Sequence, residues 1–120
     1  MADPTVIEIL GARLDYVVVR GDDFADTVTM KEGDPAVAVD LSARVFTAQV
    51  RQTADGTVVA QMAIDMTDAA TGIVGYSISD TLTATMLGSY VWDFQQNVGG
   101  VTRTLMGGKF KVKADVTRAV

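Results

Sequence analysis

The sequence predicts an all-β protein, a single antiparallel β-sandwich of about seven or eight strands with one short helical turn. In most segments apolar and polar residues alternate with period two, the spacing of strands that have one buried and one exposed face. Turn signals, mostly Gly, Asp and Pro, recur roughly every eight to twelve residues. The 120 residues suffice for one domain with its own core.

Residues 1–13 are expected to form an N-terminal arm or a first edge strand, ahead of a sandwich domain over residues 14–120. The arm contains a short apolar run bounded by a proline and a glycine, which limit its length. Chain ends are poorly fixed unless something holds them, so we expect this arm to pack on a neighbouring chain. Its candidate docking residues are Val6, Ile7, Ile9 and Leu10.

The first half of the domain predicts three strands separated by turns. The segment 14–20 is rich in β-branched and aromatic residues, which favour strands. In the next strand Asp26 interrupts an apolar face, so this strand should lie at the margin of its sheet or have one exposed half. The expected strands cover residues 14–20, 24–30 and 44–52, and the expected turns cover 20–23 and 31–35.

The dipeptide Asp55-Gly56 is the strongest hairpin signal in the chain. It predicts that residues 44–52 pair antiparallel with a single strand over residues 57–66. The apolar residues of that second strand occupy alternate positions and should share its inner face: Val58, Ala60, Met62, Ile64 and Met66.

Residues 73–87 predict a further strand and then the helical turn. The strand covers 73–79 and should bury Val74, Tyr76 and Ile78. The turn near residues 80–87 is short and rich in Thr, so it needs packing against a sheet to be stable. We expect Asp80 to be its N-cap, with Leu82, Met86 and Leu87 turned inward.

Residues 88–117 predict the central hairpin of the core. It contains the only Trp, and aromatic residues bury the most surface each. Gly107 and Gly108 predict a turn or bulge where the chain enters its last strand. The inward residues should be Tyr90, Trp92, Phe94, Phe110, Val112, Ala114 and Val116, and the outward ones include Lys109, Lys111 and Lys113.

The composition excludes several classes of function. The chain has no His and no Cys, which rules out Ser–His–Asp and Cys–His catalysis and thiolate metal sites. We therefore expect no enzymatic activity and no cofactor. A net charge of −5 disfavours nonspecific binding to nucleic acid or anionic membranes, and no apolar run reaches the roughly eighteen residues of a membrane span. We expect neither a nucleic-acid nor a membrane partner.

The charges are unevenly distributed along the chain. Residues 1–93 contain five basic and fourteen acidic side chains, whereas residues 94–120 contain five basic and one acidic. Opposite ends of two copies would therefore attract each other. Arg103, Lys109, Lys111 and Lys113 form a candidate docking surface for an acidic partner. The alternative is a solvated strand face whose charges only discourage edge pairing.

Two short acidic motifs permit a functional and a structural interpretation. Arg20-Gly21-Asp22 spells the integrin-binding tripeptide, but Gly followed by Asp is also ordinary turn chemistry. Asp22, Asp23 and Asp26 supply oxygen ligands that suit Ca²⁺, although the spacing of a Ca²⁺-binding loop is absent. Whether Ca²⁺ binds there stays open at the level of sequence.

Several weak motifs occur in a characteristic order. They are Arg20-Gly21-Asp22-Asp23-Phe24, Asp40-Leu41-Ser42, Gly88-Ser89-Tyr90-Val91-Trp92-Asp93, and Gly108-Lys109-Phe110-Lys111-Val112 followed by Asp115-Val116-Thr117. Over about residues 16–117 this order resembles small structural proteins of tailed phages and prophages, and is similar to the N-terminal Ig-like domain of phage baseplate upper proteins. The resemblance implies an Ig-like sandwich without catalysis, made in the host cytoplasm and docked in a virion.

That resemblance implies other virion proteins and further copies of the chain as partners. A chain that ends just after the sandwich suits an accessory of the tail, baseplate or connector, while head or tail location and copy number stay open. The alternatives are a capsid decoration protein and a surface carbohydrate-binding or adhesive module. Exposure of Tyr16 or Tyr76 would favour the carbohydrate-binding module, and burial of all aromatic residues would count against it.

Overall fold

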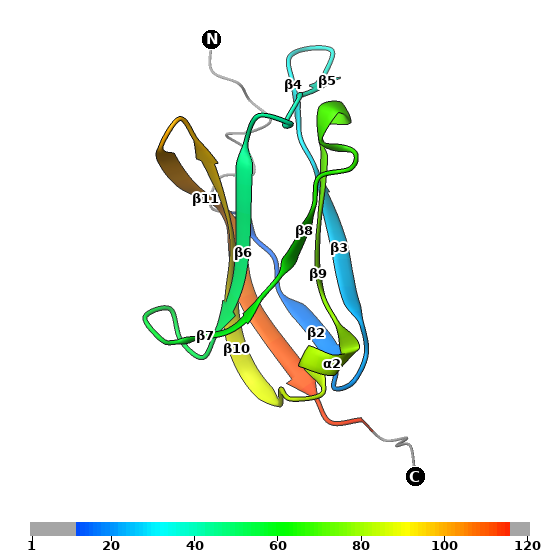
Figure 1. The fold of residues 1–120 in the computed structure, drawn as a ribbon, viewed down its shortest axis with the longest axis vertical. Coiled ribbons are helices and arrows are strands. Elements are labelled where there is room, and N and C mark those ends of the chain that lie inside the picture. The colour runs from blue at the N-terminus through cyan, green and yellow to red at the C-terminus, as the bar shows by residue number, and fades with distance from the viewer. Residues whose placement is uncertain (1–11, 116–120) are drawn as a thin grey trace.

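A computed structural model describes residues 12–115. Two sheets pack face to face as an Ig-like β-sandwich, with a small hairpin at one end (Figure 1). The predicted fold class is thereby confirmed. The arm residues Val6, Ile7, Ile9 and Leu10, and Val116 of the last predicted strand, lie outside the described residues.

The larger sheet has six strands and contains the predicted central hairpin. Its order is β1-β11-β10-β6-β7, and β2 lies beside β11 as well. The strands are β1 (Ala12–Arg13), β2 (Tyr16–Val19), β6 (Val45–Arg51), β7 (Val58–Gln61), β10 (Gly88–Val98) and β11 (Val101–Lys113). β1 and β2 run parallel to β11, whereas the other pairs of this sheet are antiparallel. The parallel pairs join strands from opposite ends of the described chain, so no local turn signal in the sequence could predict them.

The smaller sheet has three antiparallel strands in the order β3-β9-β8. The strands are β3 (Phe24–Thr29), β9 (Ile73–Ile78) and β8 (Ala63–Asp65). β3 lies at the edge, as the interruption by Asp26 predicted. β4 (Lys31–Glu32) and β5 (Val37–Ala38) form the small hairpin, η1 (Ala69–Thr71) is a 3-10 turn, and α2 (Asp80–Thr83) is the short helix. With the two-residue strands, residues 12–115 contain eleven strands, more than the seven or eight expected.

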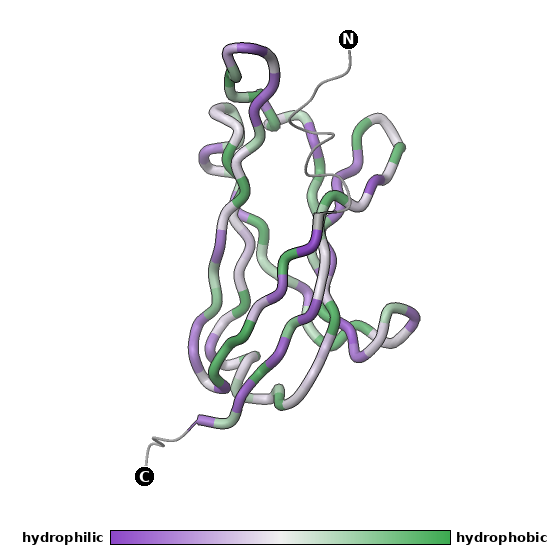
Figure 2. The backbone as a smooth tube through the Cα atoms, turned by 180° about the vertical axis from the view of Figure 1, so that it is seen from behind, coloured by the Kyte–Doolittle hydropathy of each residue, from purple (hydrophilic) through white to green (hydrophobic). Residues whose placement is uncertain are grey.

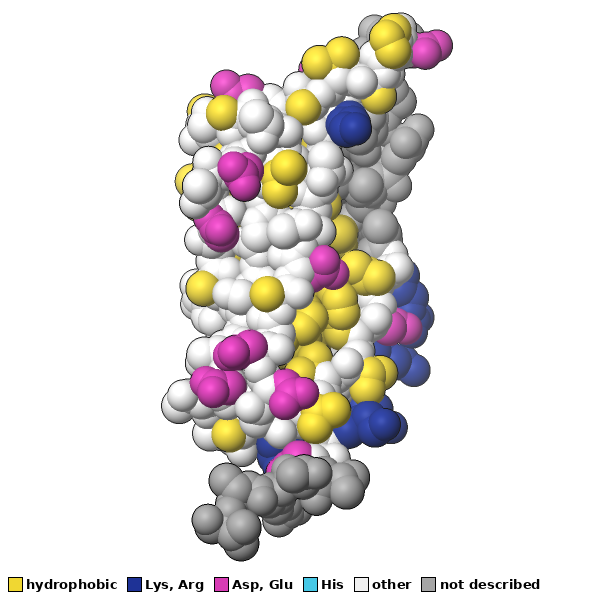
Figure 3. Space-filling view, turned by 90° about the vertical axis from the view of Figure 1, so that its right-hand side faces the viewer, with side chains coloured by type: hydrophobic (Ala, Val, Ile, Leu, Met, Phe, Trp, Pro, Cys, Tyr) yellow, Lys and Arg dark blue, Asp and Glu magenta, His cyan; other side chains and the backbone are white. Residues whose placement is uncertain are grey.

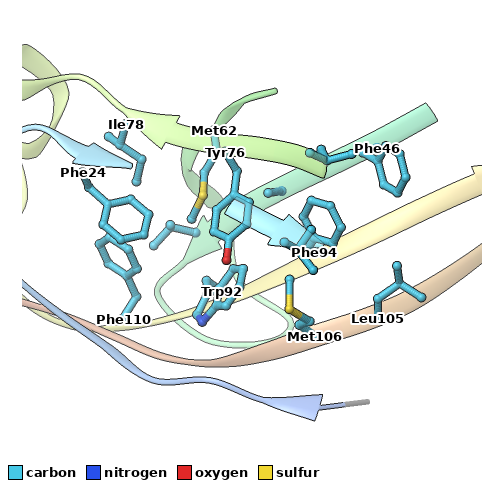
Figure 4. Packing of buried hydrophobic residues seen from close by; sticks show 14 of the residues in the cluster. Phe24, Phe46, Met62, Tyr76, Ile78, Trp92, Phe94, Leu105, Met106 and Phe110 are labelled. Atoms are coloured by element: carbon cyan, nitrogen blue, oxygen red, sulfur yellow. The ribbon is translucent and has the colours of Figure 1, made fainter. Parts of the chain in front are cut away.

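The core lies between the two sheets, and apolar and polar residues alternate along the strands (Figure 2). Ala114 departs from the predicted alternation, because it lies after the end of β11 and is exposed. Tyr90, Trp92 and Phe94 of β10 are buried, and their neighbours in sequence are half-buried or exposed. Tyr76 of the smaller sheet stacks on Trp92 of the larger sheet, with ring centroids 5.6 Å apart (Figure 4). Phe24 meets Phe110 edge to face at 5.2 Å. Aromatic pairs across the interface therefore hold the sheets together.

The prediction of a single strand over residues 57–66 was wrong. The segment splits at buried Met62 into β7, in the larger sheet, and β8, in the smaller one. Val58 was expected inside but is exposed, because the β6–β7 register shifts by one residue next to Val50. The bulge instead turns Val59 toward the core.

The helical turn forms where expected but with different contacts. Its N-cap is Ser79, whose Oγ accepts the backbone N–H of Leu82 at 3.3 Å, and not Asp80. Leu87 is 53% exposed, whereas Thr83 is fully buried. The Thr83 hydroxyl donates to the carbonyl of Asp22 at 2.7 Å, so a polar residue anchors this turn to the β2–β3 connection.

β11 runs without a turn through the two glycines, and its bulge lies earlier than expected. Phe94 pairs with Met106 and the next residue of β10 pairs with Thr104, so Leu105 is the extra residue. Leu105 and Met106 are both buried. Gly108 serves a close approach: a Cβ there would lie 2.5 Å from the carbonyl oxygen of Leu14. The prediction of a turn or bulge at the glycines was therefore wrong.

Candidate docking surface

Three lysines project from the outer face of β11. Lys109, Lys111 and Lys113 alternate with Phe110 and Val112, whose side chains are buried in the core. The alternation fixes the lysines on the solvent side of the sheet, and all three are exposed. The sequence predicted this placement from period two alone.

Two exposed valines of β2 lie beside these lysines. In the parallel register Lys111 pairs with Val17 and Lys113 pairs with Val19, and directly paired residues project on the same face. Val17 is 64% exposed and Val19 is 38% exposed. We call these five residues, Lys109, Lys111, Lys113, Val17 and Val19, the lysine face.

Lys111 and Lys113 form no ion pair among residues 12–115, whereas Lys109 interacts electrostatically with the carboxylate of Asp15. The two ion pairs of residues 12–115 join Arg13 to Asp15 at 3.2 Å and Arg20 to Asp115 at 2.9 Å, and neither involves a lysine. Basic side chains gather along one margin of the molecule, next to a strip of apolar atoms, while most acidic ones in that view lie on the other side of the strip (Figure 3). The ammonium groups of Lys111 and Lys113 therefore remain available to an external anion.

Asp15 fixes the connection between β1 and β2 against the lysine face. Its Oδ1 accepts the backbone N–H of Lys109 at 2.8 Å and the Nε–H of Arg13 at 3.2 Å. These hydrogen bonds hold the pKa of Asp15 below its ordinary value, the bond from Lys109 contributing most. The carboxylate thus stays charged and keeps β2 aligned with β11.

Arg103 does not belong to the lysine face. It pairs with Gln96, which is buried, so its backbone position lies on the inner side of the hairpin. The extra residue Leu105 reverses the alternation between Arg103 and the lysines. The sequence grouped the four basic residues because it gave no sign of this bulge.

The Arg20-Gly21-Asp22 tripeptide forms a structural turn. The Arg20 side chain is bound to Asp115, and Gly21 has a φ of +88°, a conformation that favours glycine. The Gly21 N–H donates to the hydroxyl of Thr83 at 3.2 Å. The backbone N–H of Asp22 closes the turn by donating to the carbonyl of Val19 at 3.0 Å, which supports the turn interpretation.

Two of the three carboxylates proposed as Ca²⁺ ligands, those of Asp23 and Asp26, accept hydrogen bonds from different parts of the protein. Oδ1 of Asp23 accepts the N–H of Asp80 at 2.8 Å, while Asp26 accepts the hydroxyl of Tyr16 at 2.6 Å. Among residues 12–115 no three carboxylates are arranged to hold a metal ion. The structure therefore does not bring Asp22, Asp23 and Asp26 together as one group of ligands.

A polar cluster between the sheets was missed at the level of sequence. The Tyr16 hydroxyl donates to Asp26 and lies 2.6 Å from the Tyr76 hydroxyl, so the cluster links β2 to β3 and β9. Burial, reinforced by the bond to Asp26, raises the pKa of Tyr16 above its ordinary value. The one sign of this cluster in the sequence was the position of Asp26 within an otherwise apolar strand face. Tyr16 is half-buried and the other seven aromatic side chains are buried, so the exposure expected of a carbohydrate-binding module is not seen.

A shallow hollow lies on the outer face of the larger sheet beyond the lysine face. Its single carboxylate is Asp93, which is half-buried opposite Gly107. Burial raises the pKa of Asp93, while nearby Arg51 and Gln95 act in the opposite direction. The residues that line the hollow are Gln49, Arg51, Ala54, Val91, Trp92, Asp93 and Gly108.

No described helix is long and apolar enough to cross a membrane. No family model matches the chain, and no curated protein matches it. Several solved structures are similar to the chain at low identity. An endo-β-1,4-mannanase from Thermotoga petrophila has 13% identity and a TM-score of 0.47, covering 88% of this chain and 18% of that one.

Two other solved structures are matched over most of their own length. CopC from Methylosinus trichosporium OB3b has 11% identity and a TM-score of 0.44, covering 92% of this chain and 90% of its own. AggA, the major subunit of aggregative adherence fimbriae type I from Escherichia coli, has 12% identity and a TM-score of 0.42, covering 85% and 90%. None of these three is a phage protein, and likenesses this weak assign no function.

Proposed function

We propose that the chain is a non-enzymatic structural component of a tailed-phage virion, an accessory of the tail, baseplate or connector. It acts by docking on other virion proteins and on further copies of itself through the lysine face. The order of sequence motifs supports the virion role, and the lysine face supports the docking role.

The observation that carries the docking proposal is the pairing of exposed valines with unneutralised lysines. Burying apolar surface contributes about 25 cal/mol per Å², so covering Val17 and Val19 would favour association. The ammonium groups of Lys111 and Lys113 would select an acidic partner and steer its approach. Because residues 1–93 carry a large acidic excess, an acidic surface of a second copy is one such partner.

Virion membership is tested by quantitative mass spectrometry of intact particles from the phage or prophage that encodes the chain. We expect its peptides at a fixed ratio to the major tail protein, in the tail fraction after heads and tails are separated. Recovery in the head fraction would instead identify a capsid decoration protein. Absence from purified virions, with the chain present in the lysate, would contradict the virion role.

Self-association is tested separately by sedimentation of the purified chain at low and high salt. We expect assembly that increases with concentration and weakens as salt rises, because salt screens exposed charges over about 10 Å at 0.1 M. A chain that stays monomeric at every concentration would remove self-association from the proposal. Docking on a different acidic virion protein would then be the remaining mode.

A further inference from the structure

On one side of the sandwich the exposed side chains change from basic through apolar to acidic (Figure 3). The basic part includes the lysines of β11, and the apolar part includes Val17 and Val19 of the adjacent strand β2. Three residues after Val19 the chain reaches Asp22, in the connection from β2 to β3 of the smaller sheet. The three parts are therefore continuous in the structure.

Three exposed carboxylates lie at the acidic end of this series. Asp22 and Asp23 belong to the β2–β3 connection, and Asp80 is the first residue of α2. Oδ1 of Asp23 accepts the backbone N–H of Asp80 at 2.8 Å, so the connection and the helix are held together. Among residues 12–115 none of the three forms an ion pair. We call Asp22, Asp23 and Asp80 the acidic group.

The acidic group lies at the same end of the molecule as the last lysine of β11. The N–H of Arg20 donates to the carbonyl of Lys113 at 2.8 Å, and the N–H of Asp22 donates to the carbonyl of Val19 at 3.0 Å. These bonds fix the end of β11 beside the β2–β3 connection and α2 (Figure 1). Within residues 12–115 Lys113 forms no ion pair with these carboxylates. The opposite charges are therefore level with each other along the molecule but separated across it.

We propose that two copies of the chain pair through this side as a two-fold dimer, with Lys111 and Lys113 of each copy facing the acidic group of the other. A two-fold axis along the apolar strip produces this arrangement, because it exchanges the basic and acidic sides and keeps their level along the molecule. Each contact between residues then forms twice, as in an isologous interface. Val17 and Val19 of both copies lie between the charged groups and lose exposed surface.

A second copy fits this side of the molecule better than an unrelated acidic protein does. An acidic protein would be attracted by the lysines and repelled by the acidic group beside them. A copy related by the two-fold axis satisfies both groups at once, and the assembly closes at two copies, whereas a head-to-tail contact would continue into longer assemblies. The inference rests on the docking role proposed for the lysine face, for which it identifies the partner and the symmetry.

Exchange of two charges across the interface tests the dimer. Lys113→Glu and Asp22→Lys are made separately and then together in one chain. Neither side chain has a hydrogen-bond or ion-pair partner among residues 12–115, so both variants should fold. The matched controls are Lys31→Glu, in the small hairpin, and Asp55→Lys, in the β6–β7 turn at the opposite margin of the larger sheet. Circular dichroism checks the fold of each variant, and sedimentation at low salt measures the dimer dissociation constant.

We expect Lys113→Glu and Asp22→Lys each to raise the dissociation constant at least about tenfold, because each reversal replaces attraction by repulsion at two symmetry-related contacts. The combined variant should return to within about threefold of the wild type, and the controls should stay there. A combined variant as weak as the single ones would overturn the pairing of Lys113 with Asp22. A wild type that stays monomeric, or that grows beyond a dimer, would overturn the two-fold arrangement.

Incorporation into virions separates failure of this inference from failure of the proposed function. The same variants complement a phage that lacks the gene, and copies per virion are counted by mass spectrometry. We expect incorporation to fall for Lys113→Glu and for Asp22→Lys and to recover in the combined variant. A fall for Lys113→Glu alone would overturn the dimer but leave docking of the lysine face on another virion protein. Wild-type incorporation of both single variants would count against the docking role as well.

Discussion

At the scale of single residues, a few polar side chains link segments that are distant in sequence, and one cluster joins the two sheets. The Tyr16 hydroxyl bridges Asp26 and Tyr76, and the Trp92 indole N–H donates to the carbonyl of Leu14 at 2.7 Å. No side-chain nitrogen or oxygen buried among the described residues lacks a partner. Removal of one partner should therefore lower the free energy of unfolding, because the remaining polar group would be buried without a hydrogen bond.

Tyr16→Phe tests the cluster between the sheets. The change deletes one hydroxyl, leaves the ring contacts with Phe24 and Trp92, and strands the groups of Asp26 and Tyr76 that it bonded. We expect the free energy of unfolding to fall by about 1–3 kcal/mol in urea denaturation. Adding Tyr76→Phe to this variant should cost much less than Tyr76→Phe alone, because the two hydroxyls share one hydrogen bond. Strict additivity would show that the hydroxyls act separately.

Asp93→Asn tests the raised pKa in the hollow. Because the folded state holds the Asp93 proton more tightly than the unfolded chain, ionisation lowers the stability of the wild type as pH rises from about 3.9 through the raised pKa. The amide avoids this loss and still accepts from Gln95. Thermal melting should show the variant gaining on the wild type between pH 3 and pH 7. A difference independent of pH would contradict the effect of burial.

At the scale of elements, the sequence predicted the strands in which apolar and polar residues alternate. It did not predict the irregularities that interrupt this alternation. β6 and β9 lie within one residue of the expected bounds, and β9 and β10 bury the expected residues. The chain passes from the larger to the smaller sheet at Met62, and β11 has an extra residue at Leu105. Both features depend on pairing between strands that are distant in sequence, which no local pattern predicts. The lysines were placed correctly because they follow the bulge, and Arg103 was misplaced because it precedes it.

Gly108→Ala tests the close approach between β11 and the β1–β2 connection. The added methyl group would lie 2.5 Å from both the carbonyl oxygen of Leu14 and Oδ1 of Asp15, so the connection must move. That movement weakens the bond from Trp92 to Leu14. We expect a loss of about 1–3 kcal/mol in unfolding free energy. Thr104→Ala, at an exposed site on the same strand, should change it by less than about 0.5 kcal/mol.

At the scale of the whole molecule, basic and acidic side chains lie on different parts of the surface, as they also lie in different parts of the sequence. The basic strand β11 lies between β10 and the strands β1 and β2 in the larger sheet. In one view of the molecule, basic side chains gather along one margin and most acidic ones lie on the other side of an apolar strip (Figure 3). Composition alone predicted this division, since residues 94–120 are basic in an acidic chain. The contribution of Val17 and Val19 was not predictable, because β2 joins β11 in parallel from the far end of the sequence.

Charge reversal on the lysine face is the most direct test of the docking proposal. Lys111→Glu/Lys113→Glu is compared with Lys31→Glu/Arg103→Glu, which changes the net charge equally at exposed sites away from that face. Each variant complements a phage that lacks the gene, and its copies per virion are counted by mass spectrometry. We predict that incorporation falls at least about tenfold for the first pair and stays near wild type for the second. Equal incorporation of the two folded variants would contradict docking through the lysine face.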